Sequence, residues 1–332
     1  MHLVFMIMSV NNRILFLILT VAGILFTSCV ETLISVKVHP DGRYTMNFIT
    51  KGDSIDVFNN DFPHPAGSEW NTHVTKEKRN DDDIWTMSTQ GIITQAYIFT
   101  SRNDSLTALQ HPIQVTKKDG HFATRYTLRN VFKGRQVYLK YPSFGRSLQE
   151  SDSDSTRWLD EAFYYICSQG LNDLQNDPST AINDGIAERI GNHIHNTLAR
   201  VSQKELFDEL ENKQSFIDQM LKPFSKDLPI GYSTLLSNAT NVYEEELELS
   251  SDLRDDQFKY WAILPGVITS TNADTIISDT LKWSFGLQQY INDDYVIEAA
   301  SVVYSPQRIQ TAVLITAGLF LIILFLAYKR RK

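Results

Sequence analysis

The sequence predicts an α+β domain outside the cytoplasm, with strands at both of its ends and helices in its middle, followed by one transmembrane helix. Three observations support this prediction. Apolar residues alternate as in strands near both ends of the domain, they follow the spacing of one helix face between about residues 155 and 222, and an apolar segment stands at each end of the chain. Strands and helices that are segregated in this way are typical of α+β folds and not of repeated βαβ units.

The first 28 residues have the layout of an export signal. Arg13 precedes the apolar segment 14–26, which is shorter than the roughly 20 residues of a mature membrane span. Phe26-Thr27-Ser28-Cys29 resembles a bacterial lipobox, in which cleavage before the cysteine leaves a diacylated N-terminus. We expect residues 1–28 to be this lipobox-like signal peptide and Cys29 to be lipidated. Cleavage at a nearby site and an uncleaved signal anchor are the alternatives.

The C-terminal apolar segment predicts a transmembrane helix over residues 309–328. These residues carry no charge, and as a helix they rise about 30 Å, enough to cross the hydrocarbon core. Residues 329–332 are all basic, which places this tail in the cytoplasm by the positive-inside rule. We therefore expect the domain to lie on the outer face of a bacterial inner (plasma) membrane. Pairing of strands across the helical middle would bring the two ends of the domain together at this membrane.

The predicted extracytoplasmic domain, residues 29–308, is strongly acidic. Arg13 and the four tail cations lie outside it, so 26 of the 31 Lys and Arg face all 39 Asp and Glu, a formal charge of −13. This charge argues against nucleic acid as a partner, because binding to phosphates needs Lys and Arg. The expected partners are the membrane itself and a lipid or an envelope protein. Cys167 lies on an apolar helical stripe, which predicts a buried, inert thiol.

Alternation and turn residues predict the strands of the domain. Two hairpins are expected early in the chain, the polar segment 61–83 is expected to be a loop, and strands return after the helices. The hairpins comprise residues 33–38 with 44–48 and residues 113–115 with 122–128, and the other predicted strands are 92–100, 260–264, 267–270, 280–285 and 296–304.

The helical part, about residues 155–222, is predicted to hold three amphipathic helices. The first covers Trp158 to Cys167 and stops at Gly170, and the second begins at the N-cap Asp177 before a proline. The third opens with a capping box formed by Ser202 and Glu205, and ends at Pro223. A fourth helix over residues 232–252 would carry the acidic run 244–248 on an exposed face.

Several short segments together resemble the LppM-like family of bacterial exported proteins, which often carry a lipobox and one C-terminal transmembrane helix. The segments are Cys29-Val-Glu-Thr32, Val36–Phe48 around Asp41-Gly42, Leu264-Pro-Gly-Val267, Ser270-Thr-Asn-Ala273 and Leu281-Lys-Trp283. The resemblance covers both ends of the domain and leaves out about residues 147–253. It implies a mixed αβ envelope domain with a plausible role in lipid or glycolipid handling, and it implies no catalytic residues.

The motifs that carry chemistry predict no cofactor, metal or catalytic site. His193 and His195 would point about 200° apart on a helix, and the alternating carboxylates of 150–154 lack the glycine and closing glutamate of a calcium loop. Tryptophans are more informative. Trp158, Trp261 and Trp283 are expected either to pack in the core or to line an apolar groove that receives an acyl chain or a glycan.

The sequence thus predicts a non-enzymatic, membrane-anchored envelope protein that binds a lipid, a glycolipid or an envelope partner. The alternative is a hydrolase or transferase of envelope polymers, in which carboxylates such as Asp160 and Glu161 meet in space. A scaffold that contacts a basic partner through its acidic helices is a third hypothesis. An apolar groove favours the first hypothesis, whereas carboxylates about 5–10 Å apart across a cleft favour the second.

Overall fold

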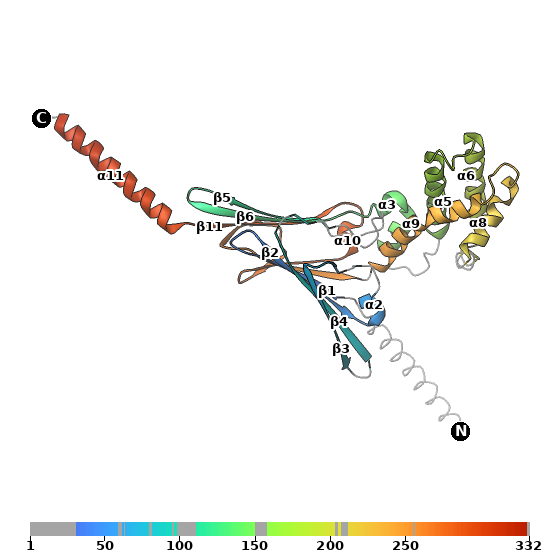
Figure 1. Cartoon of the computed structure of the whole chain (residues 1–332), viewed down its shortest axis with the longest axis horizontal. Helices are drawn as coiled ribbons and strands as arrows, with labels where there is room; N and C mark the ends of the chain where they lie inside the picture. Colours follow the sequence, from blue (N-terminus) through green and yellow to red (C-terminus); the bar gives the residue numbers. More distant parts are fainter. Residues whose placement is uncertain are drawn as a thin grey trace, which may run out of the picture.

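The computed structural model describes residues 31–58, 62, 64–79, 82–94, 96–97, 111–149, 158–202, 205–206, 212–254 and 256–330. Two β-sheets form one part of the molecule, a group of helices lies at one end of the sheets, and a long helix projects from the other end (Figure 1). The predicted signal peptide, Cys29 and the carboxylates of 150–154 lie outside the described residues.

The two sheets differ in size, and their strands come from both sides of the helical middle. The larger sheet has the order β3 (Trp70–Arg79), β4 (Asp82–Ile93), β2 (Tyr44–Gly52), β1 (Glu31–Val38), β7 (Gln257–Ile263), β10 (Thr280–Phe285) and β9 (Thr275–Ile277). The smaller sheet has the order β5 (Ile113–Asp119), β6 (Ala123–Phe132), β11 (Tyr295–Tyr304) and β8 (Val267–Thr271).

The inner faces of these sheets supply the main hydrophobic core. Along β1 and β2 every second residue is buried, including Ile34, Val36, Met46 and Phe48, so the predicted first hairpin is confirmed. The second predicted hairpin is β5–β6. Burying one such large apolar side chain contributes roughly 1.5–3 kcal/mol, which fixes the register because a slip by one residue would expose the whole set.

The first strand pairs with the strand that follows the helices. β1 and β7 are parallel, with Glu31 opposite Gln257 and Lys37 opposite Ile263. This confirms pairing across the helical middle, but the expectation that the two ends of the domain lie together is wrong. The Ser301 hydroxyl donates to the Pro265 carbonyl just beyond β7, at 2.7 Å, so β1, β7 and β11 all run towards the same end of the domain. The start of β1 and the end of β11 therefore lie at opposite ends.

Two strand predictions need correction. Residues 70–79 form β3 and not a loop: as the edge strand of the larger sheet it is exposed after Trp70, so its sequence lacks the alternation that marks a half-buried strand. The strand predicted over 92–100 ends as β4 at Ile93, and beyond it Tyr97 makes an isolated bridge to Ile113.

Four longer helices build a second hydrophobic core beside the sheets. These four are α5 (Leu159–Asn176), α6 (Asp184–Leu198), α8 (Lys213–Leu221) and α9 (Tyr232–Asp252). The described residues also form short helices, which are α2 (Ser54–Phe58), α3 (Val137–Lys140), α4 (Pro142–Gln149), α10 (Leu287–Tyr290) and the 3₁₀ turn Lys222–Phe224. The predicted helix over 232–252 is confirmed in both bounds. The capping box is also confirmed, since the backbone N–H of Ser202 donates to the Glu205 carboxylate at 3.0 Å and the Glu205 N–H to the Ser202 hydroxyl at 3.3 Å.

Three predicted helix bounds are wrong. The third predicted helix does not run unbroken from the capping box to Pro223, because α8 begins only at Lys213, after Asn212. Helix α5 continues through Gly170, where a Cβ would lie 3.0 Å from the Thr240 side chain, so this glycine serves close packing against α9 and does not end the helix. Asp177 follows the C-terminus of α5 and accepts from the Ser179 N–H at 2.9 Å, whereas α6 begins after Asn183, whose side chain accepts from Gly185 N–H.

The last helix leaves the domain directly from the smaller sheet. Helix α11 (Pro306–Arg330) follows β11 after Ser305 alone, and none of its 25 residues is buried (Figure 1). It is long and apolar enough to cross a membrane, which agrees with the span predicted over 309–328.

Candidate functional site: a groove between two helices

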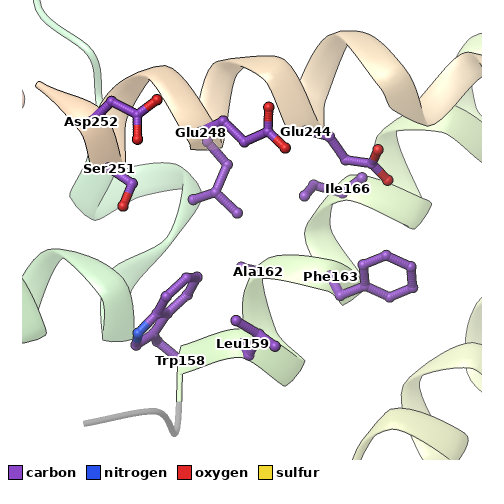
Figure 2. Close-up of a pocket in the computed structure, with 10 residues that line it drawn as sticks. Trp158, Leu159, Ala162, Phe163, Ile166, Glu244, Glu248, Ser251 and Asp252 are labelled. Atoms are coloured by element: carbon purple, nitrogen blue, oxygen red, sulfur yellow. The ribbon is translucent and has the colours of Figure 1, made fainter. Parts of the chain in front are cut away.

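An open groove lies between helices α5 and α9, at the end of the sheets that is remote from α11 (Figures 1 and 2). Its volume is about 280 Å³. Ten residues line it: Trp158, Leu159, Ala162, Phe163, Ile166, Glu244, Leu247, Glu248, Ser251 and Asp252.

One wall of the groove is apolar and comes from α5. Leu159, Ala162, Phe163 and Ile166 recur at the spacing of one helix face, and all four are buried. The half-buried ring of Trp158 stands at the start of this helix and packs on Phe144, with ring centroids 4.6 Å apart. This wall is therefore an apolar lining over about two turns of α5, and the Trp158 ring is its most accessible part.

The opposite wall carries three carboxylates on α9. Glu244, Glu248 and Asp252 are spaced by four residues and so share one face of the helix, as Figure 2 shows. Partial burial raises the pKa of Glu244, and the ammonium of Lys213, 2.5 Å away, opposes that rise. Within the part of the chain that the structure describes, the Oε1 atom of Glu244 is buried without a hydrogen-bond partner. The exposed carboxylates of Glu248 and Asp252 offer acceptors for a ligand with hydroxyl groups or positive charge.

The three tryptophans of the sequence prediction do not meet in one site. Trp158 lines the groove, whereas Trp283 is 1% exposed in the sheet core, where its indole N–H donates to the Asn272 side chain at 3.0 Å. Trp261 lies on the outer face of β7, with the Lys282 ammonium 4.7 Å from its ring centroid. Trp261 and Trp283 occupy neighbouring strands but opposite faces, because Trp283 is paired with the inward-facing Tyr260.

Two of the segments that resemble the LppM-like family, Ser270–Ala273 and Leu281–Trp283, contact each other in the structure. The Asn272 amide group donates to the Val296 carbonyl at 2.6 Å, and its oxygen accepts from the Trp283 indole and from the Glu298 N–H at 2.9 Å. Asn272 thereby joins the end of β8 to β10 and β11. Through these hydrogen bonds the segments 270–273 and 281–283 connect the two sheets.

The other candidate groups lie outside the groove or serve packing. Glu161 accepts from the backbone N–H and the hydroxyl of Ser143, at 2.8 and 2.6 Å, and so fixes α4 to α5. His193 and His195 contact different rings, those of Phe224 and Tyr164. The described residues hold no group of three or more potential metal ligands. Cys167 is buried, and this burial raises the pKa of its thiol to about 12, as an inert thiol requires.

Sequence reasoning missed the acidic wall of the groove. The run 244–248 was expected to be an exposed face, but Glu244 is partly buried against Lys213 and Glu246 is buried in an ion pair with Lys140. The four-residue spacing of Glu244, Glu248 and Asp252 was a usable signal, because it places three acids on one side of a predicted helix.

Comparison with known proteins finds only a weak structural similarity. No family model matches the sequence, and no curated protein does. Among solved structures, the chain is similar to the folded domain of LppM from Mycobacterium tuberculosis, determined by NMR, with a TM-score of 0.29 and 8% sequence identity over 85% of this chain and 95% of that one.

Proposed function

We propose that this chain is a single-pass envelope protein, held in the bacterial inner membrane by α11, whose extracytoplasmic domain binds a lipid or glycolipid without catalysis. The observation that supports binding is the α5–α9 groove, which has one apolar wall and one acidic wall. In this proposal the signal peptide is removed, Cys29 is lipidated and the C-terminal basic tail lies in the cytoplasm.

The chemistry of the two walls selects the ligand. The α5 wall suits an acyl chain, and the carboxylates of α9 suit sugar hydroxyls or a cationic group and repel an anionic headgroup. The volume of about 280 Å³ lies just below the range of roughly 300–1,000 Å³ for ligand pockets, so one acyl chain or a part of one is expected to enter.

The arrangement of the carboxylates supports binding over hydrolysis. A glycosidase places two carboxyl groups on either side of the scissile bond, about 5–10 Å apart. Here Glu244, Glu248 and Asp252 all come from one helix, and the wall opposite them is formed by Leu159, Ala162, Phe163 and Ile166.

Native mass spectrometry of the full-length protein, extracted in detergent from its own kind of host, tests the proposal. We expect a bound lipid or glycolipid that is lost in Trp158→Ala, because this ring lines the groove. Trp261→Ala is the matched control and should keep the ligand, because this ring lies on the outer face of β7. A wild-type protein that carries no ligand, or a Trp158→Ala protein that carries it fully, would contradict the proposal.

A further inference from the structure

The end of the β5–β6 hairpin lies beside the first turn of α11 (Figure 1). The Ser305 N–H donates to the Phe122 carbonyl at 2.8 Å. One turn further along, the Arg308 guanidinium donates to the carbonyls of Gly120 and His121, at 3.3 and 3.5 Å. These bonds fix residues 117–125, here called the hairpin tip, to the start of the helix.

The charges that flank α11 give the level of this contact relative to a bilayer. Residues 309–328 are uncharged between Arg308 and Lys329, and as a helix they rise about 30 Å, the thickness of the hydrocarbon core. Arg308 therefore marks the outer boundary of the hydrocarbon if α11 spans the membrane. Because Arg308 bonds to Gly120 and His121, the hairpin tip lies at the level of the lipid headgroups.

The side chains of the hairpin tip suit that level. Phe122 is 44% exposed and packs edge-to-face on His121, and Tyr304 on the adjacent end of β11 is 59% exposed. Tyrosine is enriched where a protein crosses the headgroup layer, because its ring is apolar and its hydroxyl is polar, and phenylalanine supplies apolar contact in membrane-surface segments.

The charge of the hairpin tip is opposite to that of the domain. Lys117, Lys118, Arg125 and the adjacent Arg308 face one acid, Asp119, in a domain of formal charge −13. Lys118 and Arg125 stand directly opposite each other on paired strands, and no acidic side chain among the described residues forms an ion pair with either. Like charges in this position repel, and an anionic group close to both relieves the repulsion.

We infer that the hairpin tip is a membrane-surface contact, in which Phe122 and Tyr304 enter the headgroup layer while Lys118 and Arg125 bind anionic phospholipid headgroups. This inference rests on the proposed function in one respect, namely that α11 spans the membrane. It adds that, when α11 is the only anchor, the hairpin tip holds the domain at one orientation to the bilayer, so the domain does not swing on the helix.

Fluorescence of the full chain in vesicles tests the inference. An environment-sensitive dye is attached to the cysteine of His121→Cys, in a Cys29→Ser background where α11 is the only anchor. The vesicles contain zwitterionic and anionic phospholipids, some of which carry a quenching nitroxide near the top of the acyl chain. Cys167 is buried and does not compete for the dye. Ile230→Cys is the control, because this residue is fully exposed before α9, in the helical part remote from α11.

We expect a blue shift and quenching of the dye at residue 121 and neither at residue 230. Reversing the two charges by Lys118→Glu with Arg125→Glu should reduce the quenching, whereas Lys222→Glu with Lys226→Glu, on the helical part, should not. If the protein resists alkaline extraction but the dye shows the same emission and quenching at residues 121 and 230, the inference is overturned. It is also overturned if Lys118→Glu with Arg125→Glu leaves the quenching at residue 121 unchanged. Protein extracted at alkaline pH would instead contradict the proposed spanning helix.

Discussion

Acid should destabilise the domain through a histidine buried in its core. His111 is 3% exposed, and its ring is stacked between Phe62 and Phe132, with centroids 5.3 and 5.0 Å away. Burial lowers the pKa of His111 from 6.5 to about 3. The folded state therefore keeps this imidazole neutral between about pH 6.5 and pH 3, whereas the unfolded state takes up a proton in the same window.

The size of the effect follows from the two pKa values. Stability due to the neutral ring is fully present above pH 6.5 and falls as the pH drops, because protons favour the unfolded chain. At about pH 5 the loss is roughly 2 kcal/mol, and near pH 3 it approaches roughly 5 kcal/mol. The pKa of His64, which bonds to Thr50 and Thr89, is lowered by burial to about 4 and adds a similar loss at about pH 5.

Urea unfolding of the full chain in mild detergent, at about pH 8 and about pH 5, measures this loss. His111→Phe keeps a ring between its two neighbours and removes the titrating group, so its loss of unfolding free energy should be smaller than that of the wild type by roughly 2 kcal/mol. His73→Gln removes an exposed ring from β3 and serves as the control. Equal losses in the wild type and His111→Phe would refute the reasoning.

Three further predictions concern buried polar groups and glycines. Asn272→Ala should cost about 1–3 kcal/mol of unfolding free energy in urea, because it leaves the buried Trp283 indole N–H without its acceptor. Arg135→Ala should cost about 1.5–3 kcal/mol in the same assay, because this buried guanidinium donates to the Glu246 carbonyl and the Ser250 hydroxyl near the C-terminal end of α9, and a loss below about 1 kcal/mol would contradict that role. Gly266→Ala should lower the thermal midpoint, since its φ is +84° and a Cβ would lie 2.3 Å from a carbonyl oxygen, whereas Gly191→Ala, where nothing lies within 4 Å, should leave it unchanged or raise it.

Local patterns in the sequence predict the elements whose burial is regular. The hairpin β1–β2 shows its alternation in Ile34, Val36, Met46 and Phe48, and the helix predicted over 232–252 matches α9 in both bounds. The edge strand β3 escapes prediction because neither of its faces is continuously buried, so no alternation is needed there.

Features that depend on distant contacts could not be predicted in this way. Gly170 lies inside α5 only because α9, some seventy residues later, packs against it. The groove has the same origin: its apolar wall and its acidic wall each look ordinary in sequence, and only the packing of α5 on α9 brings them face to face.

The opposite placement of the two ends of the domain has a mechanical consequence for Cys29. Glu31 is separated from Ser305 by the length of β7 and the last residues of β11, about 40 Å along the strands, and residues 29–30 reach at most about 7 Å. If the acyl chains on Cys29 insert in the bilayer that α11 spans, the long axis of the domain must lie along the membrane surface, with the helical part close to it. Without the lipid, the hairpin-tip contact inferred above would keep the domain upright, with the groove well above the membrane. Lipidation of Cys29 alone would thus set the orientation of the whole domain relative to the membrane.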